Sequence, residues 1–151
     1  MESIYKKKLI FGSLFLLANR LQVIGDKYLE KEGITTKQWL LIVMIAQFAD
    51  SIPTLSEVAQ IMGSSRQNVK QLALRLQEKG FVSIKKDERD SRVLRLKLTE
   101  KSTVFWEERR EKDEQFIIDI FNGLSEEEIH IMCNGFNKLF GNIESIEKIY
   151  K

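Results

Sequence analysis

The clearest pattern in the chain is a strict alternation of leucine with a basic residue over residues 94–98 (LRLKL). A period of two is typical of a half-buried β-strand. Upstream, residues 81–84 (FVSI) are aromatic or β-branched enough to form a partner strand. The residues between them, 85–92, carry charges of both signs and would form the connecting loop. The pattern therefore predicts a long β-hairpin with a charged tip.

Apolar residues at helical spacing, bounded by capping signals, predict helices over most of the remaining chain. A capping box pairs a Ser or Thr at the helix start with a Glu or Gln three residues later, which satisfies two free backbone N–H groups. Three such boxes are present: Thr35 with Gln38, Thr54 with Glu57, and Ser125 with Glu128. They predict helices over residues 36–49, over residues 55–62, and from residue 126 onward.

Two more helix starts follow from single capping residues. Ser64 or Ser65 can cap a helix that ends before Gly80, and Thr99 can cap a long helix that runs to about Asn122. The expected order is four helices, two strands and two helices. The expected fold class is therefore mainly α with a small β-hairpin.

Residues 55–80 combine a short helix, a tight turn at residues 62–64 and a longer helix. Their apolar residues fall on two faces that can pack across the turn, which is the pattern of a helix-turn-helix. The residues on these faces are Val58, Ala59, Ile61, Val69, Leu72, Ala73 and Leu76.

The second of these helices has a polar face made of residue types that contact DNA. Arginine pairs with guanine, and Asn or Gln with adenine, through two hydrogen bonds, while Ser and Lys reach phosphates. The candidate DNA-binding residues are Ser64, Ser65, Arg66, Gln67, Asn68, Lys70, Gln71 and Arg75. An ordinary amphipathic helix with a solvated polar face is the alternative. The charged hairpin directly after it favours DNA binding, because a β-wing adds a second contact to the same duplex.

The charge of the chain is unevenly distributed. The formal net charge is only +2 over 151 residues. Residues 63–101 hold 11 Lys and Arg against 5 Asp and Glu, whereas residues 102–151 hold 6 against 11. A basic middle and an acidic tail are the asymmetry expected when one region meets a polyanion.

Three motifs between residues 55 and 101 are the most specific in the chain. They are Leu76-x-x-Lys79-Gly80-Phe81-Val82, Asp87-x-Arg89-Asp90-x-Arg92 and Leu98-Thr99-Glu100-Lys101. With them, this segment resembles the DNA-binding core of the multiple-antibiotic-resistance regulator (MarR) family of bacterial winged-helix transcription factors. The resemblance implies a winged helix-turn-helix with N- and C-terminal dimerisation helices. It also implies a homodimeric repressor that binds a pseudo-palindromic double-stranded operator and is released by a small-molecule effector.

The same resemblance implies roles for two wing residues. Arg92 would enter the minor groove, and Asp90 would orient it by an ion pair. For Arg89 our own hypothesis is a looser contact with phosphate. The sequence departs from the family at Ser102, where glycine is usual, and a serine in the first turn of a helix is expected to be harmless. The uncommon pair Gln67-Asn68 leaves the operator sequence open.

We expect a single domain over residues 1–151, with dimerisation helices in 1–34 and 102–151 and a winged helix-turn-helix lobe in 35–101. From Ile129 to Tyr150, apolar residues of the C-terminal helix are spaced as a heptad seam. The expected dimerisation residues are Leu9, Phe11, Ile129, Met132, Phe136, Leu139, Ile143 and Ile146. A helix packed inside its own subunit is the alternative, but a palindromic operator calls for a two-fold symmetric protein.

Candidates for sensing are few. By resemblance to relatives that respond to phenolic ligands, Phe11, Phe15 and Trp39 could line an effector cavity, with core packing as the alternative explanation. His130 and Cys133 lie three residues apart, but the chain has no other His or Cys to complete a metal site. We therefore expect no metal and no cofactor, and we expect Cys133 to be a buried apolar residue.

Other functions and locations fit the sequence less well. An enzyme is not expected, because phosphate-loop, HExxH and G-x-S-x-G motifs are absent and one His with one Cys offers little acid–base chemistry. A winged-helix module that binds protein, such as an anti-regulator, remains the alternative. Residues 6–18 (KKKLIFGSLFLLA) imitate a signal peptide, but no cleavage site follows and the apolar run is too short to span a bilayer. With its single cysteine, the chain is expected to be cytoplasmic, with no membrane partner.

Overall fold

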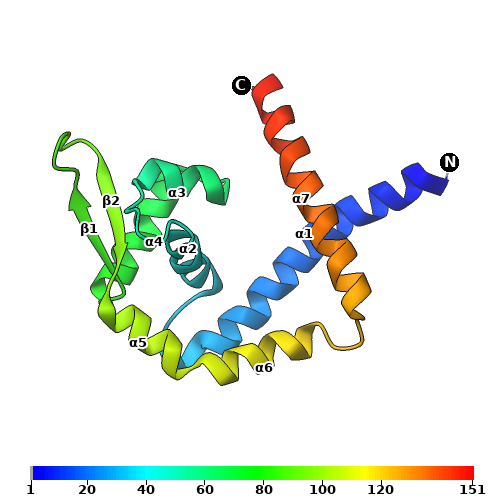
Figure 1. Ribbon diagram of the computed structural model, residues 1–151, viewed down its shortest axis with the longest axis horizontal. Helices are drawn as coiled ribbons and strands as arrows, with labels where there is room; N and C mark the ends of the chain where they lie inside the picture. The colour runs from blue at the N-terminus through cyan, green and yellow to red at the C-terminus, as the bar shows by residue number, and fades with distance from the viewer. Residues whose placement is uncertain (1) are drawn as a thin grey trace. The chain divides into compact units, whose positions relative to one another are not determined.

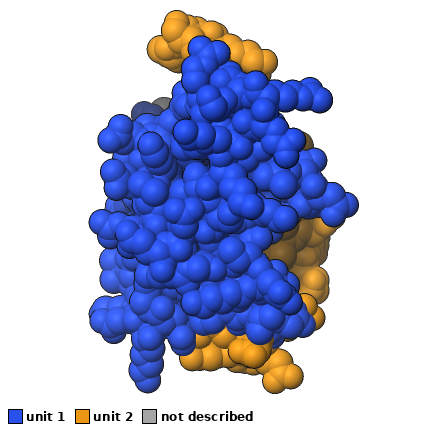
Figure 2. Space-filling model, turned by 90° about the vertical axis from the view of Figure 1, so that its left-hand side faces the viewer, with its two compact units in different colours: residues 1–107 blue, residues 108–151 orange. Residues whose placement is uncertain are grey.

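The computed structural model describes residues 2–151, which form helices and one β-hairpin (Figure 1). The elements in chain order are α1 (Glu2–Leu29), a 3-10 turn η1 (Glu30–Glu32), α2 (Thr36–Ala46), α3 (Leu55–Met62), α4 (Arg66–Glu78), β1 (Val82–Lys86), β2 (Leu94–Leu98), α5 (Glu100–Glu108), α6 (Arg110–Ile120) and α7 (Glu126–Ile149). The predicted fold class, mainly α with a small hairpin, is confirmed. Residues 1–107 and 108–151 form two compact units, which are blue and orange in Figure 2.

The capping signals located most helix starts correctly. Thr35 and Ser125 each form a complete capping box with the residue three positions later. Thr54 accepts a hydrogen bond from the backbone N–H of Glu57 at 3.1 Å, but within the described chain Glu57 does not return it. The predicted capping box at Thr54 is therefore only half formed.

Two predicted helix ends were wrong. The second helix ends at Ala46, because residues 47–50 turn and Ala49 adopts a left-handed backbone with φ of 51°. The long helix expected after Thr99 is two helices, since Arg109 leaves the regular helix between α5 and α6. No glycine or proline marks that break in the sequence.

The core of the first unit joins α2, α3, α4 and the hairpin. Leu41, Leu76 and Leu96 are each fully buried and come from α2, α4 and β2, respectively. Val58 on α3 and Val69 on α4 are also fully buried, so the two helices pack across the turn as predicted. The prediction was wrong for Ile61, which is 53% exposed. Burial of a leucine or valine side chain contributes ~1.5–3 kcal/mol to the free energy of unfolding, relative to leaving it exposed. These few residues therefore stabilise the packing of α2, α3, α4 and the hairpin.

The turn between α3 and α4 sets the position of the second helix. Gly63 ends α3 with φ of 61°, a left-handed conformation that a side chain disfavours. Two residues later, the Ser65 hydroxyl accepts a hydrogen bond from the backbone N–H of Asn68 at 3.1 Å and starts α4. The exposed polar face of α4 is therefore held on a fixed helix-turn-helix frame.

The hairpin is longer than the sequence suggested, because β1 extends to Lys86. The strands are antiparallel, with Val82 opposite Leu98 and Lys86 opposite Leu94. On the far edge of β2, the backbone N–H of Leu96 donates to the carbonyl of Pro53 at 3.0 Å. The chain just before α3 therefore pairs with the hairpin and ties the wing to the helix-turn-helix.

Residues Thr99 and Lys101 fasten the end of α4 to the start of α5. The Thr99 hydroxyl donates to the carbonyl oxygen of Gly80 at 2.6 Å, and the Lys101 ammonium donates to that of Lys79 at 2.7 Å. The same ammonium lies 5.2 Å from the centre of the Phe81 ring. These contacts satisfy carbonyl groups after the last turn of α4 that would otherwise lack partners.

By length and composition, the segment from Glu2 to Glu32 could cross a membrane, since it contains an 18-residue window with mean hydropathy of 1.3. The expectation that its apolar run is too short was therefore wrong on this measure. The indication is weak, because a signal sequence near the N-terminus or a mostly buried core helix of a soluble protein can pass the same test. The first of the four expected helices is α1, which continues past this apolar run to Leu29.

Ser102 is not the harmless substitution expected from the sequence. Its side chain is fully buried in the first turn of α5, and its hydroxyl has no hydrogen-bond partner within residues 2–151. A buried hydroxyl without a partner costs free energy, because it has lost its hydrogen bonds to water.

Replacing Ser102 with Ala should therefore raise the free energy of unfolding by about 1 kcal/mol, measured by chemical denaturation. Ser91→Ala is the matched control, because Ser91 is exposed in the wing loop and its loss should change stability little. A less stable Ser102→Ala protein would show that the hydroxyl makes a favourable contact.

Candidate nucleic-acid interface

The predicted DNA-reading residues lie on the open face of α4. All are exposed except Ser64, which is half-buried, while Val69, Ala73 and Leu76 on the opposite face are buried. Within the described chain, no hydrogen bond or ion pair occupies the side chains of Arg66, Gln67, Asn68, Lys70, Gln71 or Arg75. Their donors and acceptors are therefore free to meet an external partner.

At the wing tip, Asp90 holds the guanidinium of Arg92 in a fixed orientation. Arg92 donates from Nε to Oδ1 of Asp90 and from Nη2 to Oδ2, both at 3.1 Å, and its backbone N–H donates to Oδ1 at 3.0 Å. The Arg92 side chain is nevertheless 89% exposed. The Arg92 side-chain hydrogen bond is the main cause that lowers the pKa of Asp90. The ion pair presents an oriented cation to solvent.

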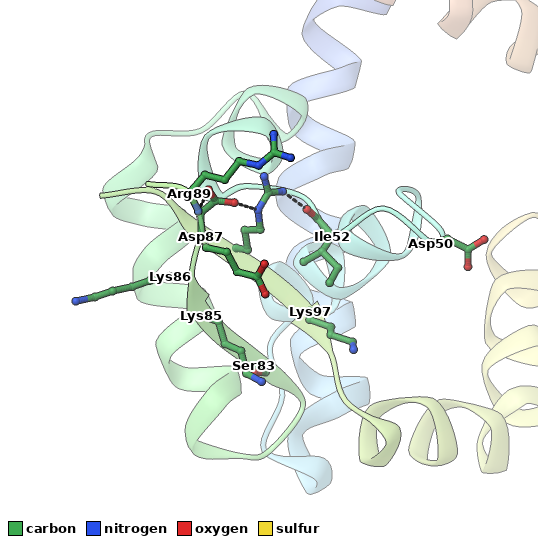
Figure 3. A pocket seen from close by; sticks show the side chains of 10 residues that line it. Asp50, Ile52, Ser83, Lys85, Lys86, Asp87, Arg89 and Lys97 are labelled. Atoms are coloured by element: carbon green, nitrogen blue, oxygen red, sulfur yellow. Dashed lines mark hydrogen bonds and ion pairs between the residues drawn. The ribbon is translucent and has the colours of Figure 1, made fainter. Parts of the chain in front are cut away.

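Asp87 organises the loop that carries this pair. Its carboxylate accepts hydrogen bonds from the backbone N–H groups of Arg89 and Asp90, each at 3.1 Å. It also accepts a 2.5 Å hydrogen bond from Nε of Arg95, whose Nη1 donates to the carbonyl of Ile52 at 2.6 Å (Figure 3). The pKa of Asp87 is lowered, chiefly by the Arg95 hydrogen bond. Arg95 thereby connects the wing tip to the loop before α3.

The sequence did not reveal this role of Arg95. The period-two pattern placed Arg95 on the outer face of β2, where a solvated side chain was the simple expectation. A signal was present, because Asp87 opens the wing motif eight residues before Arg95 and an antiparallel hairpin brings such positions together. Gln77 was also missed: its side-chain oxygen accepts a hydrogen bond from the backbone N–H of Ile84 at 2.9 Å.

The helix and the wing meet at one open hollow of about 360 Å³. Arg66 from the first turn of α4 and the pair Asp90 and Arg92 from the wing line it, together with Thr54 and Ser56 at the start of α3. The structure thus brings Arg66, a predicted DNA-binding residue of α4, close to the predicted wing residues Asp90 and Arg92. Two of its three charged lining residues are arginines.

The predicted sensing residues lie on two helices, Phe11 and Phe15 on α1 and Trp39 on α2. Phe11 and Phe15 contact each other, with ring centroids 5.2 Å apart, but are 65% and 61% exposed. Trp39 instead packs against the core of the lobe, as the core-packing alternative proposed. Cys133 is exposed on α7, so the expectation that it is buried was wrong. Among residues 2–151, no group of three or more His, Cys, Asp or Glu is placed to hold a metal.

Comparison with known proteins shows which family the chain resembles. The MarR family model matches residues 32–93, which run from the end of η1 through the helix-turn-helix and the wing tip. Over this segment, the chain is similar to the MarR family. The crystal structure of Streptococcus pneumoniae FabT in complex with DNA aligns with a TM-score of 0.67 and 25% identity, over 93% of this chain and 99% of FabT.

Two curated proteins are also similar. The transcriptional activatory protein BadR of Rhodopseudomonas palustris is 31% identical over 100 residues, which cover 65% of this chain and 57% of BadR. The transcriptional repressor MprA of Escherichia coli is 26% identical over 133 residues, which cover 88% of this chain and 73% of MprA. The chain thus spans little more than half the length of BadR.

The lowered pKa of Asp87 predicts how the wing responds to acid. A carboxyl group with a depressed pKa in the folded protein contributes stability that is fully present above its unfolded pKa and is lost as pH falls through the folded value. The loop should therefore stay ordered at neutral pH and loosen only at pH values below the ordinary aspartate range. The backbone N–H resonances of Arg89 and Asp90, followed by NMR during acid titration, should shift together there.

Two variants check this assignment. In Asp87→Ala the same resonances should differ from wild type at neutral pH and lose that transition. In Asp50→Ala, which removes an aspartate that makes none of these wing-tip hydrogen bonds, the transition should be unchanged. A transition that persists in Asp87→Ala would assign the acid response to another group.

Proposed function

We propose that this protein is a MarR-family, sequence-specific double-stranded DNA-binding transcriptional regulator. The observation that carries the proposal is the Asp90–Arg92 pair, because it holds an arginine side chain that is 89% exposed in one orientation, beside a helix of unpaired polar side chains. An exposed cation gains little from a neighbouring carboxylate on the surface. Its fixed orientation is useful only if another molecule is recognised.

The residues divide by the part of DNA that their chemistry suits. Arg66, Gln67, Asn68 and Gln71 can form paired hydrogen bonds with base edges in the major groove. Ser64, Ser65, Lys70 and Arg75 suit phosphate oxygens, which fix position but carry no sequence information. Arg92 suits a minor groove, where a narrow A·T-rich groove concentrates negative potential, and Arg89 suits a nearby phosphate.

Similarity to proteins of known role supports regulation of transcription. FabT is described in complex with DNA, BadR as an activatory protein and MprA as a repressor. We propose a repressor that a small-molecule effector releases from a pseudo-palindromic operator, acting in the cytoplasm and without enzymatic activity. The direction of regulation would be tested by the change in transcription of an operator-controlled reporter when the protein is added.

A homodimer is part of this proposal. On α1, Leu9 and Phe11 are 57% and 65% exposed, and on α7 the seam residues Phe136, Leu139 and Ile143 are 39%, 41% and 48% exposed. Large apolar side chains exposed along two helices mark an interaction surface in a soluble protein. A second copy covering them would also supply the second reading helix that a palindromic operator needs.

The dimer is tested by Phe136→Asp with Leu139→Asp. Charges in the seam should shift the protein toward a 17.6 kDa monomer in sedimentation experiments and lower operator affinity in parallel, because the two reading helices lose their spacing of ~34 Å. The matched control is Lys138→Asp, an exposed position between them on α7 but off the seam. A wild-type protein that sediments only as monomer at micromolar concentration would contradict the proposal.

The wing is tested by three variants on DNA selected from random fragments. Arg92→Ala should weaken binding about tenfold or more, since a charge-assisted hydrogen bond is worth ~1.5–3 kcal/mol, and should reduce the preference for A·T pairs that flank the half-sites. Arg89→Ala should lower affinity for all sequences alike and flatten the salt dependence by ~1 unit of log–log slope per contact.

Asp90→Ala separates an orienting role from a passive one. Removal of a passive acid near DNA would tighten binding, whereas removal of the group that holds Arg92 should weaken it despite the gain in positive charge. Tighter binding by Asp90→Ala, with unchanged flank preference in Arg92→Ala, would count against the wing mechanism. Weak binding without sequence preference in the wild type would instead favour a protein-binding module.

A further inference from the structure

The outer face of the wing carries a second, separate cluster of positive charge. Ser83 lies opposite Lys97, and Lys85 lies opposite Arg95, in the register of the two strands. Directly opposed side chains have Cβ atoms roughly 5 Å apart, and like charges in such pairs are destabilising. Three cations therefore share one small area of a two-stranded sheet, at a cost to the isolated hairpin.

Only one of these cations has an acidic partner. Arg95 pairs with Asp87, as described above. Lys85 and Lys97 are exposed, and neither makes a hydrogen bond or an ion pair with any residue in the described range 2–151. Two unneutralised ammonium groups thus flank a guanidinium on the same face, which favours an anion from outside the chain.

The cluster lines a hollow large enough for a small molecule. Its volume is about 500 Å³, within the range of ~300–1,000 Å³ usual for ligand sites. Ile52 from the loop before α3 adds an apolar wall. Three acidic residues also line the hollow: Asp87 is held by Arg95, Asp50 points away from Lys85 and Lys97 in Figure 3, and Glu88 is exposed. The five basic residues of the lining outnumber them: Lys85, Lys86, Arg89, Arg95 and Lys97.

We propose that this hollow binds a small molecule that carries a phosphate group or paired carboxylates, held by Lys85, Lys97 and the guanidinium of Arg95. Three cations on one face of the sheet suit a doubly charged anion, and the Ser83 hydroxyl adds a hydrogen-bond donor beside them. The hollow differs from the one between α4 and the wing tip, because the two have no lining residue in common.

Occupancy of this site reaches the wing tip through Arg95. An anion that binds the guanidinium competes with Asp87, whose carboxylate also holds the backbone of Arg89 and Asp90. Ligand binding would thereby loosen the loop that presents Arg92. This regulatory consequence rests on the proposed DNA-binding function, whereas binding of the anion does not.

Binding is measured by calorimetry on the full-length protein without DNA, with inorganic pyrophosphate in one series and succinate in the other. The double variant Lys85→Gln with Lys97→Gln should bind the preferred anion at least about tenfold more weakly, since ~1.4 kcal/mol corresponds to tenfold. The matched control removes the same charge elsewhere on the lobe, by Lys31→Gln with Lys37→Gln, and should change affinity less than about twofold.

NMR locates the ligand and completes the test. In the wild type, the backbone resonances of Ser83 and Lys97 should shift on titration with the anion.

Equal weakening in the two double variants would show a general charge effect and overturn the site, as would failure of both anions to bind. Loss of affinity in Lys85→Gln with Lys97→Gln for duplex DNA alone would assign these lysines to DNA phosphate and also overturn it. Anion binding by a protein that binds no DNA would leave the site standing and refute the proposed function.

Discussion

The carboxylate of Asp87 is the interaction on which the wing depends. It accepts hydrogen bonds from two adjacent backbone N–H groups of the loop and from the guanidinium of Arg95, so the loop and β2 are joined through one side chain. Arg95 extends the connection to the carbonyl of Ile52, ahead of α3. A two-stranded hairpin is marginal by itself, and these bonds attach it to a lobe with its own core.

The fold was largely predictable because its signals are local. The capping residue Ser65 and the apolar face of α4 act within one or two turns, and the alternation of residues 94–98 fixes which side of the strand is buried. The break at Arg109 was not predictable in this way. The residues around Arg109 include no glycine or proline, so no local sequence signal predicts that the helix ends there.

The candidate interface was predictable in its residue types but not in its connections. The resemblance of the wing motif to the MarR family implied the ion pair between Arg92 and Asp90, which the structure contains. The hydrogen bonds of Arg95 and the buried position of Ser102 depend on segments distant in the sequence, and no local pattern reports them. The exposure of Cys133 was missed for the same reason. Apolar residues at helical spacing do not show whether other residues of the same chain cover them.

The hydrogen bonds from Thr99 and Lys101 to the two carbonyls that follow α4 have a mechanical consequence. With Phe105 and Trp106 packed on the core of the lobe, they make α4 and the first turns of α5 move as one body. The start of α5 is therefore tied to the end of α4 well before the regular helix is interrupted at Arg109. A displacement of the first turn of α5 would reach α4 directly, through these two hydrogen bonds.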